Sequence, residues 1–145
     1  MESEAVGISA LAAMPLFSSV GSHDLENIVR IGQRHSFDPD QAIVQRGEPG
    51  DGLYIVLRGT ARVDVGGRYH DLRPGDFFGE MALIAGRKRT ATVKALDRVD
   101  ALRIGAEEFQ GFLVQQPQVA LAILKSLVER LREVQERLDA WAGMG

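Results

Sequence analysis

The residues whose chemistry stands out lie close together between positions 78 and 91. Gly79 precedes a short helix-forming run, Glu80 to Ala85, which Gly86 ends. The first turn of a helix exposes unpaired backbone N–H groups and a partial positive charge, and both favour an anion. Because glycine has no Cβ, Gly79 also lets a ligand approach the backbone closely. This segment is therefore predicted to hold an anionic ligand.

Two charged side chains indicate what kind of anion this is. Arg89 can bring a planar guanidinium to two phosphate oxygens at once. Glu80 would repel a phosphate, but its carboxylate can accept a hydrogen bond from a sugar hydroxyl. Arg87 and Lys88 are interpreted as solvated charges rather than ligand groups. One guanidinium for a phosphate and one carboxylate for a ribose together predict a nucleotide pocket.

Other interpretations of these residues are weaker. Glu80 and Arg89 could instead form an ordinary surface ion pair, which would contribute little to stability. The pattern of the whole segment favours a nucleotide pocket over this interpretation. His23, His35 and His70 lie far apart in the sequence, which disfavours a small metal-dependent barrel enzyme and predicts no metal site. The sequence shows no nucleophile–base pair and no phosphate-binding P-loop, so we expect no catalytic activity.

The elements that must position this segment fall into three zones: helical residues 1–32, β residues 33–104 and helical residues 105–141. In the middle zone, apolar and polar residues alternate in short runs separated by glycine turns such as Gly66-Gly67. The sequence predicts an α+β fold. An antiparallel β-barrel (a jelly roll) is preceded by N-terminal helices and followed by two C-terminal helices, the last one long.

Capping residues and prolines give the expected helix bounds. Ser22 stands where the N-cap of the second N-terminal helix belongs. The first C-terminal helix is expected over residues 107–114. Pro117 opens the long helix, because proline suits the first helical position, and the helix is expected to run to about Trp141 and to end at Gly143.

Length and composition narrow the class of protein. The chain of 145 residues suits a single domain over residues 1–145. Its 17 Lys and Arg against 20 Asp and Glu give a net charge of −3, which argues against a dedicated nucleic-acid binder. The absence of cysteine excludes disulfides and cysteine-ligated zinc. The apolar residues 5–17 are too few to span a membrane and follow an acidic start, so we expect a soluble, cytoplasmic protein without membrane insertion.

Segment 78–91 closely resembles the phosphate-binding cassette of cyclic nucleotide-binding domains, the family of the catabolite activator protein and the regulatory subunit of protein kinase A. Its specific pattern is Gly79-Glu80 with Ala82-Leu83, then Arg89 with Ala91 two residues later. The resemblance covers roughly residues 14–141. It also includes Pro15-Leu16-Phe17, Gly47-Glu48-Pro49-Gly50-Asp51 before a Tyr-Ile-Val strand, Gly59 after that strand, and Pro74-Gly75-Asp76-Phe77-Phe78.

The resemblance implies a role for each residue of the cassette. Glu80 would bind the ribose 2′-hydroxyl. Arg89 would bind the cyclic phosphate, together with backbone amides near Gly79 and Ala82 and at Thr90. A hydroxyl at the position of Thr90 can bond the amino group of guanine, so this position admits cGMP without excluding cAMP, which we favour. The resemblance implies a cyclic nucleotide as ligand and no cofactor.

The resemblance also implies how the base is covered. Met81 and Val63 are candidates for the apolar wall beside the base. In this family the last helix closes over the base, so residues 105–141 are predicted to form the hinge and the lid. The matching positions in this helix carry no hydroxyl group, and Gln135 or a nearby arginine such as Arg130 is left as the candidate to cap the base.

The last helix carries an unbroken heptad pattern. Its seam has apolar residues at 4-3-4-3-4-3 spacing and comprises Ala120, Leu124, Leu127, Leu131, Val134, Leu138 and Trp141. In the first half, Val119, Leu121, Ile123 and Val128 widen this face, which should therefore also pack on the barrel. We expect a homodimer through this helix. The alternative is that the helix only folds back on its own barrel.

The function that these observations predict is a non-catalytic regulatory or sensor domain that binds a 3′,5′-cyclic nucleotide. DNA binding is not expected, because transcription factors of the family continue into a helix-turn-helix beyond the last position matched here. The alternative is a degenerate cyclic nucleotide-binding fold that serves as a dimerisation or interaction module. The presence of both Glu80 and Arg89 disfavours this alternative.

Overall fold

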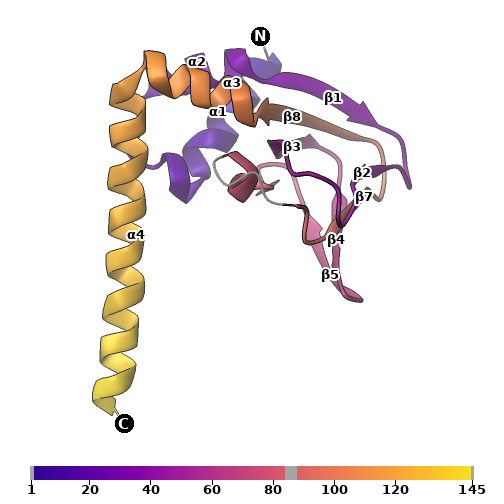
Figure 1. Cartoon of the computed structure of the whole chain (residues 1–145). Helices are drawn as coiled ribbons and strands as arrows, with labels where there is room; N and C mark the ends of the chain where they lie inside the picture. Colours follow the sequence, from indigo (N-terminus) through magenta and orange to yellow (C-terminus); the bar gives the residue numbers. More distant parts are fainter. Residues whose placement is uncertain (1, 84–87, 145) are drawn as a thin grey trace.

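The computed structural model describes residues 2–83 and 88–144, and it has helices at both ends of the chain around two antiparallel sheets (Figure 1). The N-terminal helical elements are α1 (Glu2–Ala13), the short 3-10 helix η1 (Pro15–Phe17) and α2 (Ser22–Ile31). The strands are β1 (Gln33–Phe37), β2 (Ala42–Val44), β3 (Gly52–Arg58), β4 (Ala61–Val65), β5 (Arg68–Leu72), β6 (Phe77–Phe78), β7 (Thr92–Ala95) and β8 (Val99–Gly105). The remaining elements are the 3-10 helix η2 (Glu80–Leu83), α3 (Ala106–Gln115) and α4 (Pro117–Met144).

The strands form two four-stranded sheets, in the orders β1-β8-β3-β6 and β2-β7-β4-β5. All of the strand pairs within them are antiparallel. The hairpin between β4 and β5 closes at Gly66-Gly67, whose φ angles of +59° and +87° are those that a tight hairpin turn requires. The predicted α+β fold, with antiparallel strands between N-terminal and C-terminal helices, is confirmed.

Strand β3 contributes side chains to two apolar clusters, one between its sheet and the helices and one between the two sheets. Leu53, Ile55 and Leu57 pack with the helices, whereas Tyr54 and Val56 face the second sheet. Successive side chains of a strand point to opposite faces, so a strand that is covered on both faces reads as a continuous apolar run. Strand β8 divides its side chains between the two clusters in the same way. The helices are thereby fixed to the sheet that also borders the predicted cassette.

Helix bounds differ slightly from those expected. Ser22 is the first residue of α2 rather than its N-cap, and Gly21 takes the cap position without a side-chain hydrogen bond. Helix α3 is one residue longer at each end than predicted. Helix α4 continues through Gly143 to Met144. A glycine ends a helix when it adopts a positive φ, and Gly143 is not among the glycines that do so.

Helix α4 packs on the domain only through its first part. Val119, Ile123 and Ser126 are buried, and every residue from 127 to 143 is exposed. Leu121 and Val128 are exposed as well, so the expectation that they widen the packed face is wrong. Figure 1 shows the rest of α4 extending away from the sheets. Despite the length of this helix, neither it nor any other helix within residues 2–83 and 88–144 is apolar enough to cross a membrane.

Candidate functional site

A cavity of about 360 Å³ lies between the predicted cassette and the sheet that contains β4. Its volume falls in the range of small-molecule sites, roughly 300–1,000 Å³. Seven of the eight residues predicted from the sequence line this cavity: Val63, Gly79, Glu80, Met81, Ala82, Arg89 and Thr90. The structure therefore brings together residues from β4, from η2 and from the segment before β7, as a ligand site requires.

Gly79 is the point where the cassette turns. Its φ of +85° is left-handed, a conformation that residues with a side chain rarely adopt. A Cβ at this position would also collide with Nη1 of Arg89 and would lie 2.8 Å from the carbonyl oxygen of Gly52. Glycine is needed here for both its conformation and its size, because the arginine passes directly against its backbone.

The helical run after Gly79 begins at Glu80 as expected and is wound more tightly than an α-helix over its described residues. Up to Leu83, the last residue described before position 88, it is the 3-10 helix η2, in which the N–H of Ala82 donates to the carbonyl oxygen of Gly79 at 3.0 Å. The Ala82 amide is thus engaged by the turn in this conformation. The predicted helix end at Gly86, and Arg87, lie outside the described residues.

Arg89 is buried in the wall of the cavity, with 9% of the residue exposed. Its Nη2 donates to the carbonyl oxygen of Gly52 at 2.7 Å and lies 3.9 Å from Oδ1 of Asp51. The guanidinium also lies over the ring of Tyr54, 5.8 Å from its centroid. Burial lowers the pKa of Arg89 from its ordinary value, and the nearby Tyr54 and Asp51 act in the opposite direction. The group stays cationic because arginine starts from a very high pKa.

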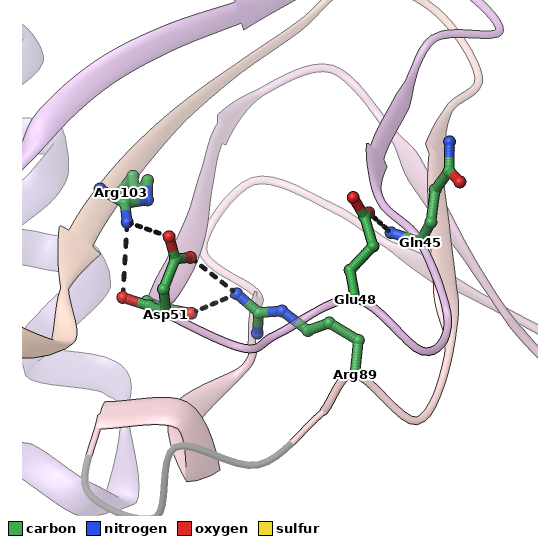
Figure 2. Close-up of polar contacts among 6 residues, drawn as sticks. Gln45, Glu48, Asp51, Arg89 and Arg103 are labelled. Atoms are coloured by element: carbon green, nitrogen blue, oxygen red, sulfur yellow. Dashed lines mark hydrogen bonds and ion pairs between the residues drawn. The ribbon is translucent and has the colours of Figure 1, made fainter.

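The backbone around Arg89 is held by the turn that precedes β3. The N–H of Arg89 donates to the carbonyl oxygen of Glu48 at 2.8 Å, and the N–H of Gly47 donates to the carbonyl oxygen of Arg89 at 2.9 Å. The carboxylate of Glu48 accepts a hydrogen bond from the backbone N–H of Gln45 and so closes this turn (Figure 2). The Gly47-to-Asp51 motif therefore holds in place the backbone of the segment before β7 that carries Arg89.

Asp51 connects the arginine to the C-terminal helices. Its Oδ2 lies 2.9 Å from Nη2 of Arg103 on β8, and its carbonyl oxygen accepts a hydrogen bond from the N–H of Ala106, the first residue of α3, at 2.8 Å. Figure 2 shows the Asp51 carboxylate between the two guanidinium groups of Arg89 and Arg103. Sequence reasoning gave Asp51 and Arg103 no role. The motif that ends at Asp51 was a signal, but nothing in the spacing links this residue to Arg89.

Glu80 and Thr90 are exposed at the cavity, as is Met81, which is 61% exposed. The ion pair that the structure gives Arg89 is with Asp51 and not with Glu80, so the surface-pair interpretation of Glu80 and Arg89 finds no support here. Glu80 is left facing the cavity with its carboxylate accessible to a ligand. Lys88 is exposed at the edge of the same cavity, as expected for a solvated charge.

Gln135 is the predicted site residue that the structure does not bring to this cavity. It is exposed on α4, nine residues beyond the last buried position, Ser126. Arg130 and Arg132 are exposed on the same helix, and Arg132 pairs with Glu136 one turn later at 3.7 Å. Because α4 is continuous from Pro117 and leads away from the sheets, none of its second half reaches the cavity in this arrangement.

Comparisons with known proteins place this geometry in a family. Residues 34–116 match the profile of the cyclic nucleotide-binding domain. A cyclic nucleotide-gated potassium channel from Rhizobium etli is 38% identical over 120 residues, which cover 83% of this chain and 34% of the channel. The cyclic AMP receptor protein of Thermus thermophilus is 29% identical over 131 residues, covering 86% of this chain and 61% of the receptor.

The fold has close solved counterparts as well. The N-terminal domain of a transcriptional regulator from Streptomyces coelicolor A3(2) superposes with a TM-score of 0.79 at 28% identity, over 88% of this chain and 93% of that domain. The chain thus spans about a third of the length of the R. etli channel but nearly all of the S. coelicolor domain. The resemblance recognised in the cassette is confirmed: the chain belongs to the cyclic nucleotide-binding domain family.

Proposed function

We propose that this chain is a regulatory domain that binds a 3′,5′-cyclic nucleotide and has no catalytic activity of its own. The observation that carries the proposal is a buried guanidinium, Arg89, in the wall of a cavity that also presents the Glu80 carboxylate and the Gly79 turn. A fixed cation for a phosphate beside a free acceptor for a ribose hydroxyl suits a ring-closed nucleoside monophosphate. The absence of cysteine is compatible with the reducing cytoplasm, where we place its action.

The charges around Arg89 allow it to take up a phosphate. Its ion pair with Asp51 is long, at 3.9 Å, whereas Asp51 lies only 2.9 Å from Arg103. When a phosphate draws the Arg89 guanidinium towards the cavity, Asp51 therefore keeps its closer partner. The Asp51 side chain is also 70% exposed, so the exchange leaves no buried carboxylate unpaired and avoids the penalty that breaking a buried ion pair would bring.

The rest of the cavity suits a purine. Val63, Val65 and Met81 give it apolar walls, and the Thr90 hydroxyl is a polar group within it. The exposed side chain of Met81 would lose contact with water when a base covers it. We favour cAMP because the T. thermophilus relative is a cyclic AMP receptor, and the Thr90 hydroxyl keeps cGMP as the second ligand.

Ligand binding is proposed to move the C-terminal helices. The side chain of Gln110 on α3 donates to the carbonyl oxygen of Leu83 at the end of η2, at 3.1 Å. A displacement of the cassette would therefore displace α3 or break this hydrogen bond. Helix α3 ends at Gln115, and only its C-cap residue Gln116 separates it from Pro117, which opens α4, so we place the hinge at this point. Closure about this hinge would bring the second half of α4, with Gln135, over the base.

The exposed seam of α4 supports a homodimer. Six of its seven apolar residues are exposed: Leu124, Leu127, Leu131, Val134, Leu138 and Trp141. Arg130 and Arg137 flank the seam at equivalent heptad positions, where they would face each other in an antiparallel pair of helices. We therefore propose a parallel homodimer. If the chain binds no nucleotide, this seam supports the second candidate function, a dimerisation module on a degenerate fold.

Calorimetric titration of the purified chain with cAMP, cGMP and 5′-AMP tests the proposal. We expect saturable binding of cAMP or cGMP and much weaker binding of 5′-AMP, which has the base and ribose but an open phosphate. The comparison isolates the contribution of the cyclic phosphate. If neither cyclic nucleotide binds at millimolar concentration, the proposed function is wrong and the second candidate replaces it.

A further inference from the structure

Two polar residues are buried among those whose side chains the structure describes, 5–83 and 88–143: Arg89 in the cavity wall and Ser126 on α4. Ser126 is only 1% exposed, and the buried residues before it on α4 are Val119 and Ile123, which belong to the apolar core. Burying a hydroxyl in such surroundings is unfavourable unless it is hydrogen-bonded. The hydrogen-bond partners of the Ser126 hydroxyl therefore indicate the structural role of this residue.

Ser126 makes three hydrogen bonds, two of which cross to the N-terminal segment. Its Oγ accepts from Oγ of Ser18 at 3.1 Å and from the backbone N–H of Ser19 at 3.0 Å. It donates to the carbonyl oxygen of Ala122, one turn earlier on α4, at 3.1 Å. A serine hydroxyl has one donor and two acceptor sites, so all of its bonding capacity is used. The contact joins residues 108 positions apart in the sequence.

The position of Ser126 along α4 makes these bonds sensitive to the angle of the helix. Ser126 lies nine residues beyond Pro117, which is about 13 Å along the helix axis at 1.5 Å per residue. A swing of α4 by roughly 30° about its first residue would move Ser126 by about 7 Å relative to the turn at residues 18–19. Hydrogen bonds do not survive such a displacement. The two bonds to Ser18 and Ser19 thus belong to the arrangement in which Gln135 stands away from the cavity, whereas the bond to Ala122 lies within α4 and moves with the helix.

We propose that Ser126 and the turn at residues 18–19 form a polar latch that holds α4 away from the cavity in the ligand-free domain and that nucleotide binding must open. This inference rests on the proposed function, because the latch matters only if α4 closes over a ligand. The free protein binds with an apparent affinity reduced by the fraction that is in the closed arrangement. Removing the latch raises this fraction and therefore strengthens binding.

Three serine variants test the latch by calorimetric titration with cAMP and cGMP. Ser126→Ala should bind the preferred nucleotide about three- to tenfold more tightly than the parent chain, which is the factor that one net hydrogen bond supplies. Ser18→Ala, at an exposed residue whose side chain donates to Ser126, should give a smaller gain in the same direction, and its exposure leads us to expect a folded protein even if Ser126→Ala does not fold. Ser9→Ala, at an exposed serine of α1, should leave affinity unchanged.

The outcomes separate the two proposals. A parent chain that binds nucleotide, with variants at Ser126 and Ser18 that bind equally or more weakly, overturns the latch and leaves the proposed function in place. A parent chain that binds neither nucleotide overturns the proposed function. Hydrogen exchange without ligand then still tests the latch. The amides of Ser19 and of residues 119–127 should exchange at least about threefold faster in Ser126→Ala than in the parent, and unchanged exchange overturns the latch.

Discussion

Replacing Arg89 with alanine removes the cation on which the proposed phosphate site depends. A hydrogen bond to a charged group contributes roughly 1.5–3 kcal/mol, which corresponds to about 10- to 150-fold in a dissociation constant. Arg89 is 9% exposed, so solvent weakens this interaction little, and the loss should not fall below the lower end of that range. We expect Arg89→Ala to weaken binding of the preferred cyclic nucleotide by at least about tenfold. The affinity of Arg89→Lys should lie between those of the parent chain and Arg89→Ala, because lysine keeps the positive charge but lacks the planar guanidinium.

Arg89 also has a structural task, which the experiment must separate from ligand binding. Its bond to the carbonyl oxygen of Gly52, at 2.7 Å, ties the cassette to β3, and losing it should destabilise the fold by about 1–3 kcal/mol. Thermal unfolding of each variant without ligand measures this loss of stability separately from the loss of affinity. Arg73→Ala is a matched control, because Arg73 is an exposed residue in the turn before β6 and does not line the cavity.

The decisive assay is calorimetric titration of cAMP and cGMP at a temperature where every variant is folded. The control variant should bind like the parent chain. If folded Arg89→Ala binds either nucleotide within twofold of the parent, the guanidinium is not the phosphate ligand and the assignment of this cavity fails.

Three further changes test the rest of the site and the seam. Glu80→Gln should weaken nucleotide binding less than Arg89→Ala does, because an amide oxygen still accepts a hydrogen bond from a ribose hydroxyl, and a larger loss in the same titration would contradict this role. Gly79→Ala should destabilise the fold by about 1–3 kcal/mol and impair binding, because the left-handed φ and the packed Arg89 both exclude a Cβ. Gly111→Ala, where a Cβ meets nothing within 4 Å, should not lower the unfolding midpoint. Leu131→Asp should dissociate the proposed dimer in sedimentation or light scattering, while Ala140→Asp, which lies off the seam, should not.

The sequence by itself determined the features that depend on local spacing. Glycines at turns, alternation in β4 and the 4-3 spacing in α4 each reflect the geometry of one element, so they predict that element without knowledge of its neighbours. The cassette is also local. Gly79, Glu80 and Arg89 lie within eleven consecutive positions, and the structure places all three around one cavity.

Only the tertiary structure decided which distant groups hold these elements in place. Arg89 is anchored by Gly52, 37 positions away, and Ser126 by Ser18, 108 positions away. It also decided that α4 leaves Gln135 outside the cavity, although the helix itself was predicted from Pro117 onwards. Hydrogen bonds and ion pairs of this kind have no period along the chain. They form because packing of the helices on β3 and β8 brings the partners within reach, and that packing is a property of the whole fold.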